Sequence, residues 1–557
     1  MITRKRKILY FLIVPAIIFL LLIAIFFIII NRIGGDDYTG EFARLLPPET
    51  SALATLENLE TVWNQASSMQ PFINAANSNV IREKLLSDDQ EEDSDKNSAR
   101  ERLEKRFRFG KDIIMRWMGR EVCVAFVPSP DSAEPPGLIL MSRTELGFEE
   151  RMAEFFAIHY PELNLETTHY KNSAIRCYKG EEKRDSLCFM RFGKTVFISF
   201  RTENPWILKK IIDCQTDRDL PSLFDQEDFR EYNEEKPKEG LSIFISPEIF
   251  LTGLKHSGDI SDSKNIEESL PFLNGLLAGF RYIMVNLTLE DNLKGQVHFY
   301  RKQPETNDPL IKDEFRVVSL ADDDIDGLLA FRGAPDSVSE DIRKILDFLI
   351  MEENEEEDVE ENILLNTIRD KMLVHINGEV SLVLNRILPG LLFPVPQMNL
   401  FMEVSGPEAS ENLAKTFGLK ATFSGEPGEI MTPLGPLTAK KRLLDSMEFL
   451  ELSLGVPRKN ITEDSNTLRK NEMFAAFKKR DSKRTDLLLL LDFRKIHQDL
   501  AEMQPLPRFW KEKTREKVAK AGDWFEVLSH FKGFLLWRLD EPEVIRYNFS
   551  FPFEENN

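Results

Sequence analysis

The feature that most constrains this fold is a repetition inside the chain. Residues 119–126 read GREVCVAF, and residues 377–384 read NGEVSLVL. Each copy continues with a second apolar run that leads into a segment whose apolar residues recur at spacings of three and four, in 137–156 and again in 398–417. A short apolar run predicts a strand, and a spacing of three and four predicts a helix. The chain therefore contains the same strand, strand and helix pattern twice.

The repetition extends beyond this stretch. Superposed without a gap, the two copies place Met141 on Met402 and Phe156 on Phe417. Three further pairs of matching runs occur in the same order: 53–63 with 329–339, 195–200 with 448–454, and 241–246 with 487–493. Both copies close with a hairpin pattern, at 282–300 and 533–551. We predict that the two copies superpose as one fold with the same strand order.

An uncharged apolar run of 23 residues lies near the N-terminus, at 8–30. As a helix it would be roughly 34 Å long, which is enough to cross the hydrocarbon core of a bilayer. Four basic residues precede the run, whereas Arg32, Asp36 and Asp37 follow it. Because Lys and Arg concentrate on the cytoplasmic side of membrane spans, the N-terminus is predicted to be cytoplasmic. The body would then be periplasmic or extracellular, with a bacterial inner membrane as the expected site.

A cleaved signal peptide is the alternative interpretation of this run. Its apolar region would have about 7 to 15 residues and would end at a small-residue cleavage site. Here the run is longer, and the following IINRIGGDD offers no such site. The sequence therefore favours an uncleaved signal anchor that spans the membrane once.

The repeat unit is about 250 residues long, too long for a solenoid repeat, so each copy is predicted to be a whole domain. Strands and helices are mixed without strict alternation, which predicts the α+β class with largely antiparallel sheets and packed helices. The expected architecture is a single transmembrane helix followed by two tandem duplicated domains. Its predicted parts are a cytoplasmic tip and anchor (1–35), a first α+β domain (36–305), a linker (306–326) and a second α+β domain (327–557).

The charge of the chain bears on its partners. The formal net charge is -21, which disfavours a nucleic-acid partner because phosphates require a concentrated basic surface. Two acidic runs, at 87–95 and 352–361, fall at the same place in each copy and are expected to be solvated loops, with divalent-cation or partner binding as the alternative. The basic segment 100–120 either faces its own sheet or binds anionic lipid or another polyanion.

Residues 322–327 resemble the start of a calcium-binding loop. Asp322, Asp324 and Asp326 precede Gly327, as in the first half of an EF-hand loop. The twelfth position is Gly333, where a bidentate Glu is needed, and a strand-like run follows instead of a helix. Calcium binding is therefore disfavoured.

The sequence contains no recognisable catalytic or cofactor motif. It has no G-x-S-x-G, no phosphate-binding or dinucleotide-binding glycine pattern, no H-E-x-x-H and no C-x-x-C. None of the histidines lies at ligand spacing to another His or to a Cys, which disfavours zinc. They are His159, His169, His256, His298, His375, His497 and His530. We predict no catalytic residue, no cofactor and no metal.

Four cysteines occur, all in the first copy. Cys177 and Cys188 flank the polar turn EEKRD, and a hairpin centred on that turn would place them directly opposite each other. Opposed Cβ atoms lie about 4.5 to 5.5 Å apart, slightly above the disulfide range, and a one-residue slip would send the side chains to opposite faces. A Cys177–Cys188 disulfide with a structural role and two free thiols both remain open. Cys123 and Cys214 are expected to be buried thiols.

Several stretches of the first copy carry a resemblance to a known family. These are LPPETSALATLENLETVW after the anchor, the pair GREVCVAF and GLILM, and GKTVFISFRTENPWILKKIID followed by SLFDQEDFREYNEEKPKEGLSIFIS. Together they make most of residues 45–300 similar to an uncharacterised family of bacterial envelope proteins, a domain of unknown function with an N-terminal anchor and a large α+β exterior part. The resemblance implies a location and an architecture, but no catalytic residues.

Three functions follow as hypotheses. The first is a non-enzymatic, membrane-anchored envelope protein that scaffolds or binds an envelope protein or lipid partner through its exterior domains. The second is a binding module for an apolar ligand such as lipid, because the 41 Phe residues could line a cavity. The third is a hydrolase with an unrecognised site, which would require a cleft that gathers a nucleophile, a base and an orienting carboxylate.

Overall fold

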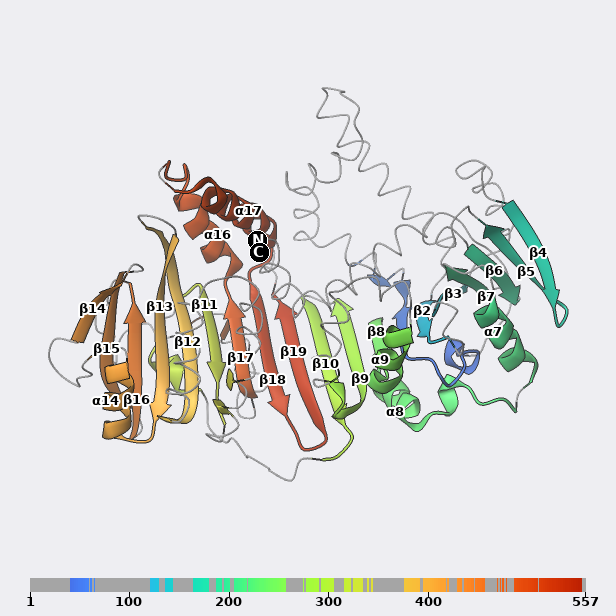
Figure 1. Ribbon diagram of the computed structural model, residues 1–557, viewed down its shortest axis with the longest axis horizontal. Helices are drawn as coiled ribbons and strands as arrows, with labels where there is room; N and C mark the ends of the chain where they lie inside the picture. Colours follow the sequence, from blue (N-terminus) through green and yellow to red (C-terminus); the bar gives the residue numbers. More distant parts are fainter. Residues whose placement is uncertain are drawn as a thin grey trace, which may run out of the picture.

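The computed structural model describes most of the chain between residues 41 and 552 (Figure 1). The described ranges are 41–59, 121–129, 136–143, 164–179, 187–192, 195–200, 205–256, 277–304, 315–333, 375–390, 394–419, 428–455 and 485–552, with short gaps at 218, 290–291, 322–323, 417, 433–434, 445 and 509, and a few isolated residues between them. The predicted anchor at 8–30 lies outside these ranges. Within them, no helix has the length and apolar character that a membrane span requires.

The nineteen described strands form one sheet in which all paired strands run antiparallel. The strands of the first half are β1 (Ala52–Glu57), β2 (Glu121–Val127), β3 (Gly137–Arg143), β4 (Asn164–Tyr170), β5 (Ser173–Lys179), β6 (Leu187–Phe192), β7 (Thr195–Phe200), β8 (Gly240–Ile245), β9 (Phe280–Leu289) and β10 (Leu293–Arg301). Those of the second half are β11 (Gly327–Phe331), β12 (Ile376–Pro389), β13 (Pro394–Val404), β14 (Gly428–Thr432), β15 (Gly435–Leu444), β16 (Met447–Leu454), β17 (Thr485–Leu491), β18 (Phe534–Asp540) and β19 (Val544–Phe551).

The two halves of the sheet have the same strand order. In the first half the order is β4-β5-β6-β7-β3-β2-β1-β8-β9-β10. In the second half it is β14-β15-β16-β13-β12-β11-β17-β18-β19, and among the described residues of that half only β4 has no counterpart. The equivalent strands β10 and β19 pair antiparallel and join the halves, so the sheet continues from β14 to β4 (Figure 1).

The prediction of two tandem α+β domains, each with its own sheet, is therefore wrong. The described strands make a single antiparallel 19-stranded sheet. The reason is the β10–β19 pairing, which we call the seam. An unpaired edge strand exposes a row of backbone N–H and C=O groups, and pairing the last strand of each half covers both edges at once.

One row of directly opposed residues crosses the seam and shows which positions are equivalent. It is two-fold symmetric about the point between Gln296 and Asn548. The row reads Met190, Phe197, Met141, Cys123, Thr55, Ser242, Asn286, Gln296, Asn548, Trp537, Leu488, Ala330, Ser381, Phe401, Glu451 and Lys440. Met141 is thus equivalent to Phe401. The ungapped superposition of Met141 on Met402 is wrong by one residue, which moves a strand side chain to the other face.

We call the face of the sheet that carries Met141 and Phe401 the η face, because short 3-10 helices cover it in both halves. In the first half it packs against η1 (Phe42–Arg44), η3 (Leu223–Asp225), α7 (Trp206–Thr216) and α8 (Glu227–Glu235). In the second half it packs against η4 (Arg316–Ser319) and residues around Phe474. Each set buries an apolar cluster, which is the main source of folding stability.

The opposite face carries the longer helices of the second half. They are α14 (Pro407–Thr416), α16 (Phe493–Glu502) and α17 (Glu512–Leu528), and α9 (Pro247–His256) is the counterpart of α16 in the first half. Asp492 caps the N-terminus of α16, and its side chain accepts hydrogen bonds from the backbone N–H groups of Arg494 and Lys495. Figure 1 shows α16 and α17 together at one end of the strands β11 and β17.

Candidate functional site

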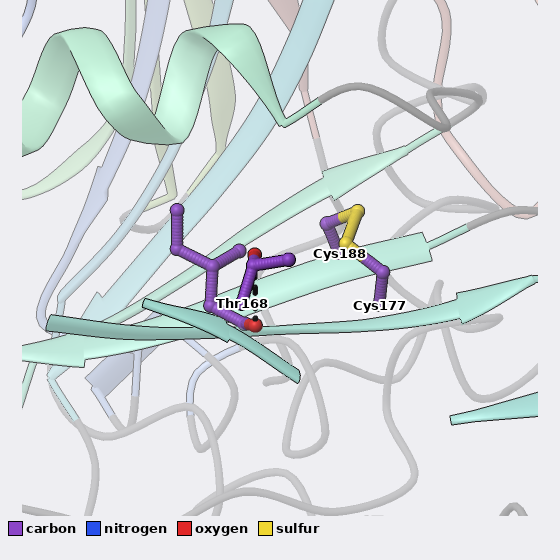
Figure 2. Close-up of a disulfide and its surroundings, with 4 residues drawn as sticks. Thr168, Cys177 and Cys188 are labelled. Atoms are coloured by element: carbon purple, nitrogen blue, oxygen red, sulfur yellow. Dashed lines mark hydrogen bonds between the residues drawn. A yellow bond between two sulfur atoms is a disulfide. The ribbon is translucent and has the colours of Figure 1, made fainter. Parts of the chain in front are cut away.

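The structure joins the two cysteines that the sequence places across a predicted turn. Cys177 on β5 lies directly opposite Cys188 on β6, and their Sγ atoms are 2.13 Å apart in a disulfide (Figure 2). Both side chains are buried. On the neighbouring strand β4, the Thr168 hydroxyl donates a hydrogen bond to the Ile175 carbonyl (Figure 2). The bridge closes a short loop and constrains the unfolded chain, which is a structural role.

Neither free cysteine is activated as a nucleophile. Cys123 is buried in β2, and its Sγ lies 3.4 Å from the Thr55 hydroxyl. Burial is the largest cause that raises the pKa of Cys123 far above its usual value, and burial also raises the pKa of Cys214. The thiolate is the reactive form, so a raised pKa makes each thiol less reactive than an unperturbed cysteine. Cys214 is only partly buried, so the expectation of a buried thiol is confirmed for Cys123 alone.

The predicted charge features are only partly described. The acidic runs at 87–95 and 352–361 and the basic segment at 100–120 lie outside the described residues. Of the calcium-like stretch, Asp324 is exposed and its carboxylate lies 2.7 Å from the Lys495 ammonium, whereas Asp326 is buried beside β11. In the part of the chain that the structure describes, no three His, Cys, Asp or Glu side chains converge as metal ligands.

His298 is buried in β10 near the seam, in a group of polar side chains. Its Nδ1 lies 3.5 Å from the Tyr300 hydroxyl, which donates a hydrogen bond to Glu235 at the end of α8. Burial, followed by the charge of Arg546, lowers the pKa of His298 to about 4. Burial and the hydrogen bond to Glu235 raise the pKa of Tyr300. A phenol activated as a nucleophile needs the opposite shift, so this His, Tyr and Glu arrangement does not support covalent catalysis.

A group of polar side chains on the η face of the second half is the strongest candidate for a binding site. We call it the polar strip. It lies on β12, β13, β15 and β16 and consists of Asn385, Asn399, Lys440, Arg442, Glu451 and Ser453.

The side chains of the polar strip are joined by hydrogen bonds. The Asn385 amide donates to Asn399 Oδ1 at 2.9 Å, and Asn399 Nδ2 donates to Glu451 Oε1 at 3.1 Å. Arg442 Nε donates to Glu451 Oε2 at 2.7 Å, and the Ser453 hydroxyl donates to Glu451 Oε1 at 3.3 Å. Three donors therefore fix the buried carboxylate of Glu451 in one orientation.

The first half has an apolar core at the equivalent positions. Ile139 and Phe197 take the places of Asn399 and Glu451, and both are fully buried. Met190 and Phe192 take the places of Lys440 and Arg442. The apolar side chains of α7 that cover this core are Ile207, Leu208, Ile211 and Ile212. One fold thus carries an apolar core in one half and a polar network in the other.

The polar strip can bind hydrogen-bonding and charged groups. Asn399, Lys440 and Arg442 are partly exposed, and 24% of the Arg442 side chain is accessible to solvent. Burial, followed by the charge of Arg442, lowers the pKa of Lys440. The strip contains two cations, Lys440 and Arg442, and one carboxylate, Glu451. It is therefore formally positive by one charge, within a chain whose net charge is -21. It offers amide, hydroxyl and cationic groups that can form hydrogen bonds and ion pairs with a partner.

Sequence reasoning missed this strip, although one signal pointed to it. After β7 the chain reads PWILKKIIDCQT, the amphipathic pattern that becomes α7. After β16 the corresponding stretch at 456–467 reads VPRKNITEDSNT, with only Val456 and Ile461 as large apolar residues. That composition does not predict an amphipathic helix like α7, so polar side chains on the equivalent strands of the second half are the expectation consistent with the sequence.

No protein family, curated protein or solved structure matches this chain.

Proposed function

We propose that the chain is a single-pass, membrane-anchored envelope protein whose exterior part binds a polar envelope component without catalysing a reaction. The polar strip is the proposed binding surface. The single observation that carries this proposal is the replacement of an apolar core by a hydrogen-bonded polar network at the same positions of a duplicated sheet. Membership of the bacterial envelope family described above is part of the same proposal.

The order within the strip favours binding over mere solvent exposure. An exposed sheet face needs only polar side chains, which are free to move. Here Glu451 is 7% exposed and accepts hydrogen bonds from Asn399, Arg442 and Ser453. Side chains that are fixed before binding lose less conformational entropy when a partner arrives, which increases affinity.

The proposed location rests on the apolar run at 8–30 and on the Cys177–Cys188 disulfide. Disulfides form and persist in the periplasm and outside cells and are rare in a reducing cytoplasm. The bridge is buried between strands and joins two of the four cysteines of the chain. A stable bridge of this kind favours a body on the non-cytoplasmic side of the membrane.

The alternative of an apolar ligand receives less support. Aromatic rings of the first half pack on one another: the centroids of Phe229 and Phe244 are 5.2 Å apart, and those of Tyr232 and Phe244 are 5.3 Å apart. The ring centroid of Tyr282 lies 5.9 Å from that of Phe244. These distances are typical of filled aromatic cores. The raised pKa values of Cys123 and Tyr300 likewise weigh against the unrecognised hydrolase.

Site-specific photocrosslinking tests the binding surface. A photoreactive amino acid is placed at Arg442, whose side chain lies on the polar strip, in the full-length protein in native membranes. The matched control is the neighbouring residue Leu443, which points to the opposite face and is 67% exposed. We expect a discrete adduct from position 442 that is absent from position 443.

Two outcomes would refute the proposal. One is the absence of any adduct at position 442 in cells that express the protein at its normal level. The other is the same adduct from positions 442 and 443, because two faces of one strand cannot share one specific contact.

A further inference from the structure

The two strands of the seam each carry three successive polar side chains on the η face. They are Lys294, Gln296 and His298 on β10, and Arg546, Asn548 and Ser550 on β19. We call these six residues, together with Asn286 on β9, the seam patch. Met284 on β9 and Leu535 and Leu539 on β18 lie beside it and belong to the buried apolar clusters of the two halves. The patch is thus a polar surface between two apolar cores, at the middle of the sheet (Figure 1).

Three amide side chains lie side by side in the seam patch. Gln296 is directly opposite Asn286 on one side and Asn548 on the other, and adjacent strands are about 4.8 Å apart. Asn286 is 4% and Asn548 7% exposed, whereas Gln296 between them is exposed to solvent. None of the three amides hydrogen-bonds to another residue in the part of the chain that the structure describes. The patch is therefore buried on both sides, accessible at its centre, and without the partners that buried amides normally have.

Other polar atoms next to these amides also lack partners. Five buried atoms have no hydrogen-bond partner among the described residues: Asn286 Oδ1, His298 Nε2, Arg546 Nε, Asn548 Nδ2 and the Trp537 indole nitrogen. Arg546 is directly opposite His298, and Trp537 on β18 is directly opposite Asn548. The five atoms thus come from four neighbouring strands of one face. Buried polar atoms are rarely left unpaired in native proteins unless water or a ligand pairs with them.

The unpartnered atoms include acceptors as well as donors. The Tyr300 hydroxyl donates its proton to Glu235, so the contact between His298 Nδ1 and this hydroxyl requires a proton on Nδ1. The low pKa of His298, about 4, keeps the ring neutral, and Nε2 is then an acceptor. Asn286 Oδ1 is the second acceptor. The donors are Arg546 Nε, Asn548 Nδ2 and the Trp537 indole N–H.

These atoms restrict the chemistry of a ligand. An ionised carboxylate or sulfate only accepts, so it would leave both acceptors of the seam patch unpaired, and an apolar ligand would pair with none of the five atoms. A peptide backbone presents its N–H and C=O groups in a fixed alternation. Each hydroxyl group of a sugar both donates and accepts, so a sugar can pair with all five atoms.

We propose that the seam patch is a second binding site of the protein, that its ligand is a glycan, and that the site exists only because the two halves pair at the seam. Gln296 and Asn548 are related by the two-fold symmetry of the seam, so each half contributes one of the two central amides. The site is separate from the polar strip. A seam patch that binds nothing would therefore leave the photocrosslinking result at position 442 as it is.

Calorimetric titration of the full-length chain in detergent tests the proposal. The probes are two neutral oligosaccharides, maltotetraose and tetra-N-acetylchitotetraose, with sodium sulfate as the anionic comparison. We expect saturable binding of at least one oligosaccharide and no binding of sulfate. Asn548→Leu should lower the affinity about tenfold, because the amide offers the ligand both a donor and an acceptor.

Urea denaturation of the same variant separates a binding role from a structural one. A buried amide that nothing satisfies destabilises the free protein, and its replacement by an apolar side chain of similar shape removes that cost. Asn548→Leu should therefore leave the urea midpoint unchanged or raise it. A lower midpoint would show that the amide is satisfied within the fold, by ordered water, and would overturn the proposal.

Asn412→Leu is the control, because Asn412 is exposed on α14 at the opposite face of the sheet. This change should leave the affinity and the urea midpoint as in the wild type. If Asn548→Leu does not fold, Gln296→Ala replaces it, since the exposed Gln296 side chain is not needed for packing, and the same loss of affinity is expected. Three results of the titration would contradict the proposal: no binding of either oligosaccharide, binding of sulfate alone, or an unchanged affinity in the seam variants.

Discussion

The ring of Phe549 on β19 lies over Gly295 on β10, directly opposite it at the seam of the sheet. A Cβ atom at residue 295 would lie 1.9 Å from Phe549 Cζ, far inside contact distance. The glycine therefore provides the space that lets an aromatic ring cover the pairing between the two halves.

Replacement of Gly295 by Ala should weaken the seam. The added methyl group must displace the Phe549 ring, and overpacking of this kind costs about 1 to 3 kcal/mol of unfolding free energy. Urea denaturation measures the loss. The double variant Gly295→Ala/Phe549→Leu should recover part of it, and Gly279→Ala is the control because nothing lies within 4 Å of its Cβ position. Equal losses at 279 and 295 would contradict this interpretation.

Cysteine alkylation reports the compartment of the body. Protein taken from its native membrane and denatured without reductant should alkylate at two of its four cysteines, Cys123 and Cys214, and at all four after reduction. The Cys177→Ser variant should alkylate at three without reductant, because Cys188 is then free. Alkylation of all four cysteines of the wild type without reductant would show that the body is not in an oxidising compartment.

His298 should make the protein sensitive to acid. Its pKa is about 4 in the folded chain and about 6.5 when unfolded, so the unfolded chain binds more protons between these values. Stability is therefore fully present above pH 6.5 and is lost as pH falls to 4, by up to about 3 kcal/mol. Denaturation of wild type and His298→Leu at pH 7.5 and pH 4.5 isolates this contribution. The variant should lose less stability over that interval, and an identical loss would refute the assignment.

The buried ion pair of Asp486 and Arg538 should be costly to break but less costly to remove. Arg538 Nε lies 2.9 Å and Nη2 2.7 Å from Asp486 Oδ2, and both residues are buried. Arg538→Met leaves a buried carboxylate without its cation and should cost about 3 to 5 kcal/mol. The double variant Asp486→Leu/Arg538→Met should cost less than that single change. A double-mutant cycle with additive losses would show that the pair does not act as a unit.

Local patterns in the sequence were sufficient to predict many of the strands. The stretches GREVCVAF and NGEVSLVL became β2 and β12, which occupy equivalent places beside β1 and β11. The turn between Cys177 and Cys188 placed these residues opposite each other, because hairpin register depends only on the residues around the turn. Apolar periodicity and turn chemistry are properties of neighbouring residues, and a single sequence displays them directly.

The sequence did not predict the register between distant strands correctly. The superposition of Met141 on Met402 failed because strands that are buried on both faces lack the alternation that would reveal a one-residue shift. The Asp492 N–H donates to the Asp326 carbonyl at 2.8 Å across 166 positions of sequence, and only the docking of α16 on the sheet brings the two residues together. The polar strip likewise depends on the pairing of strands β12, β13, β15 and β16, which places Asn399 and Arg442 beside Glu451.

By itself the sequence determined that the chain is duplicated, where most of its strands lie, and that an apolar run long enough to span a membrane precedes them. The tertiary structure alone decided that both copies share one sheet. The strands β10 and β19 are far apart in the chain, and no local sequence pattern indicates that they pair. Either strand could have remained an edge. One set of backbone hydrogen bonds covers both strand edges, and the ring of Phe549 packs on Gly295. This stabilisation exists only in the folded protein, where the two halves are in contact.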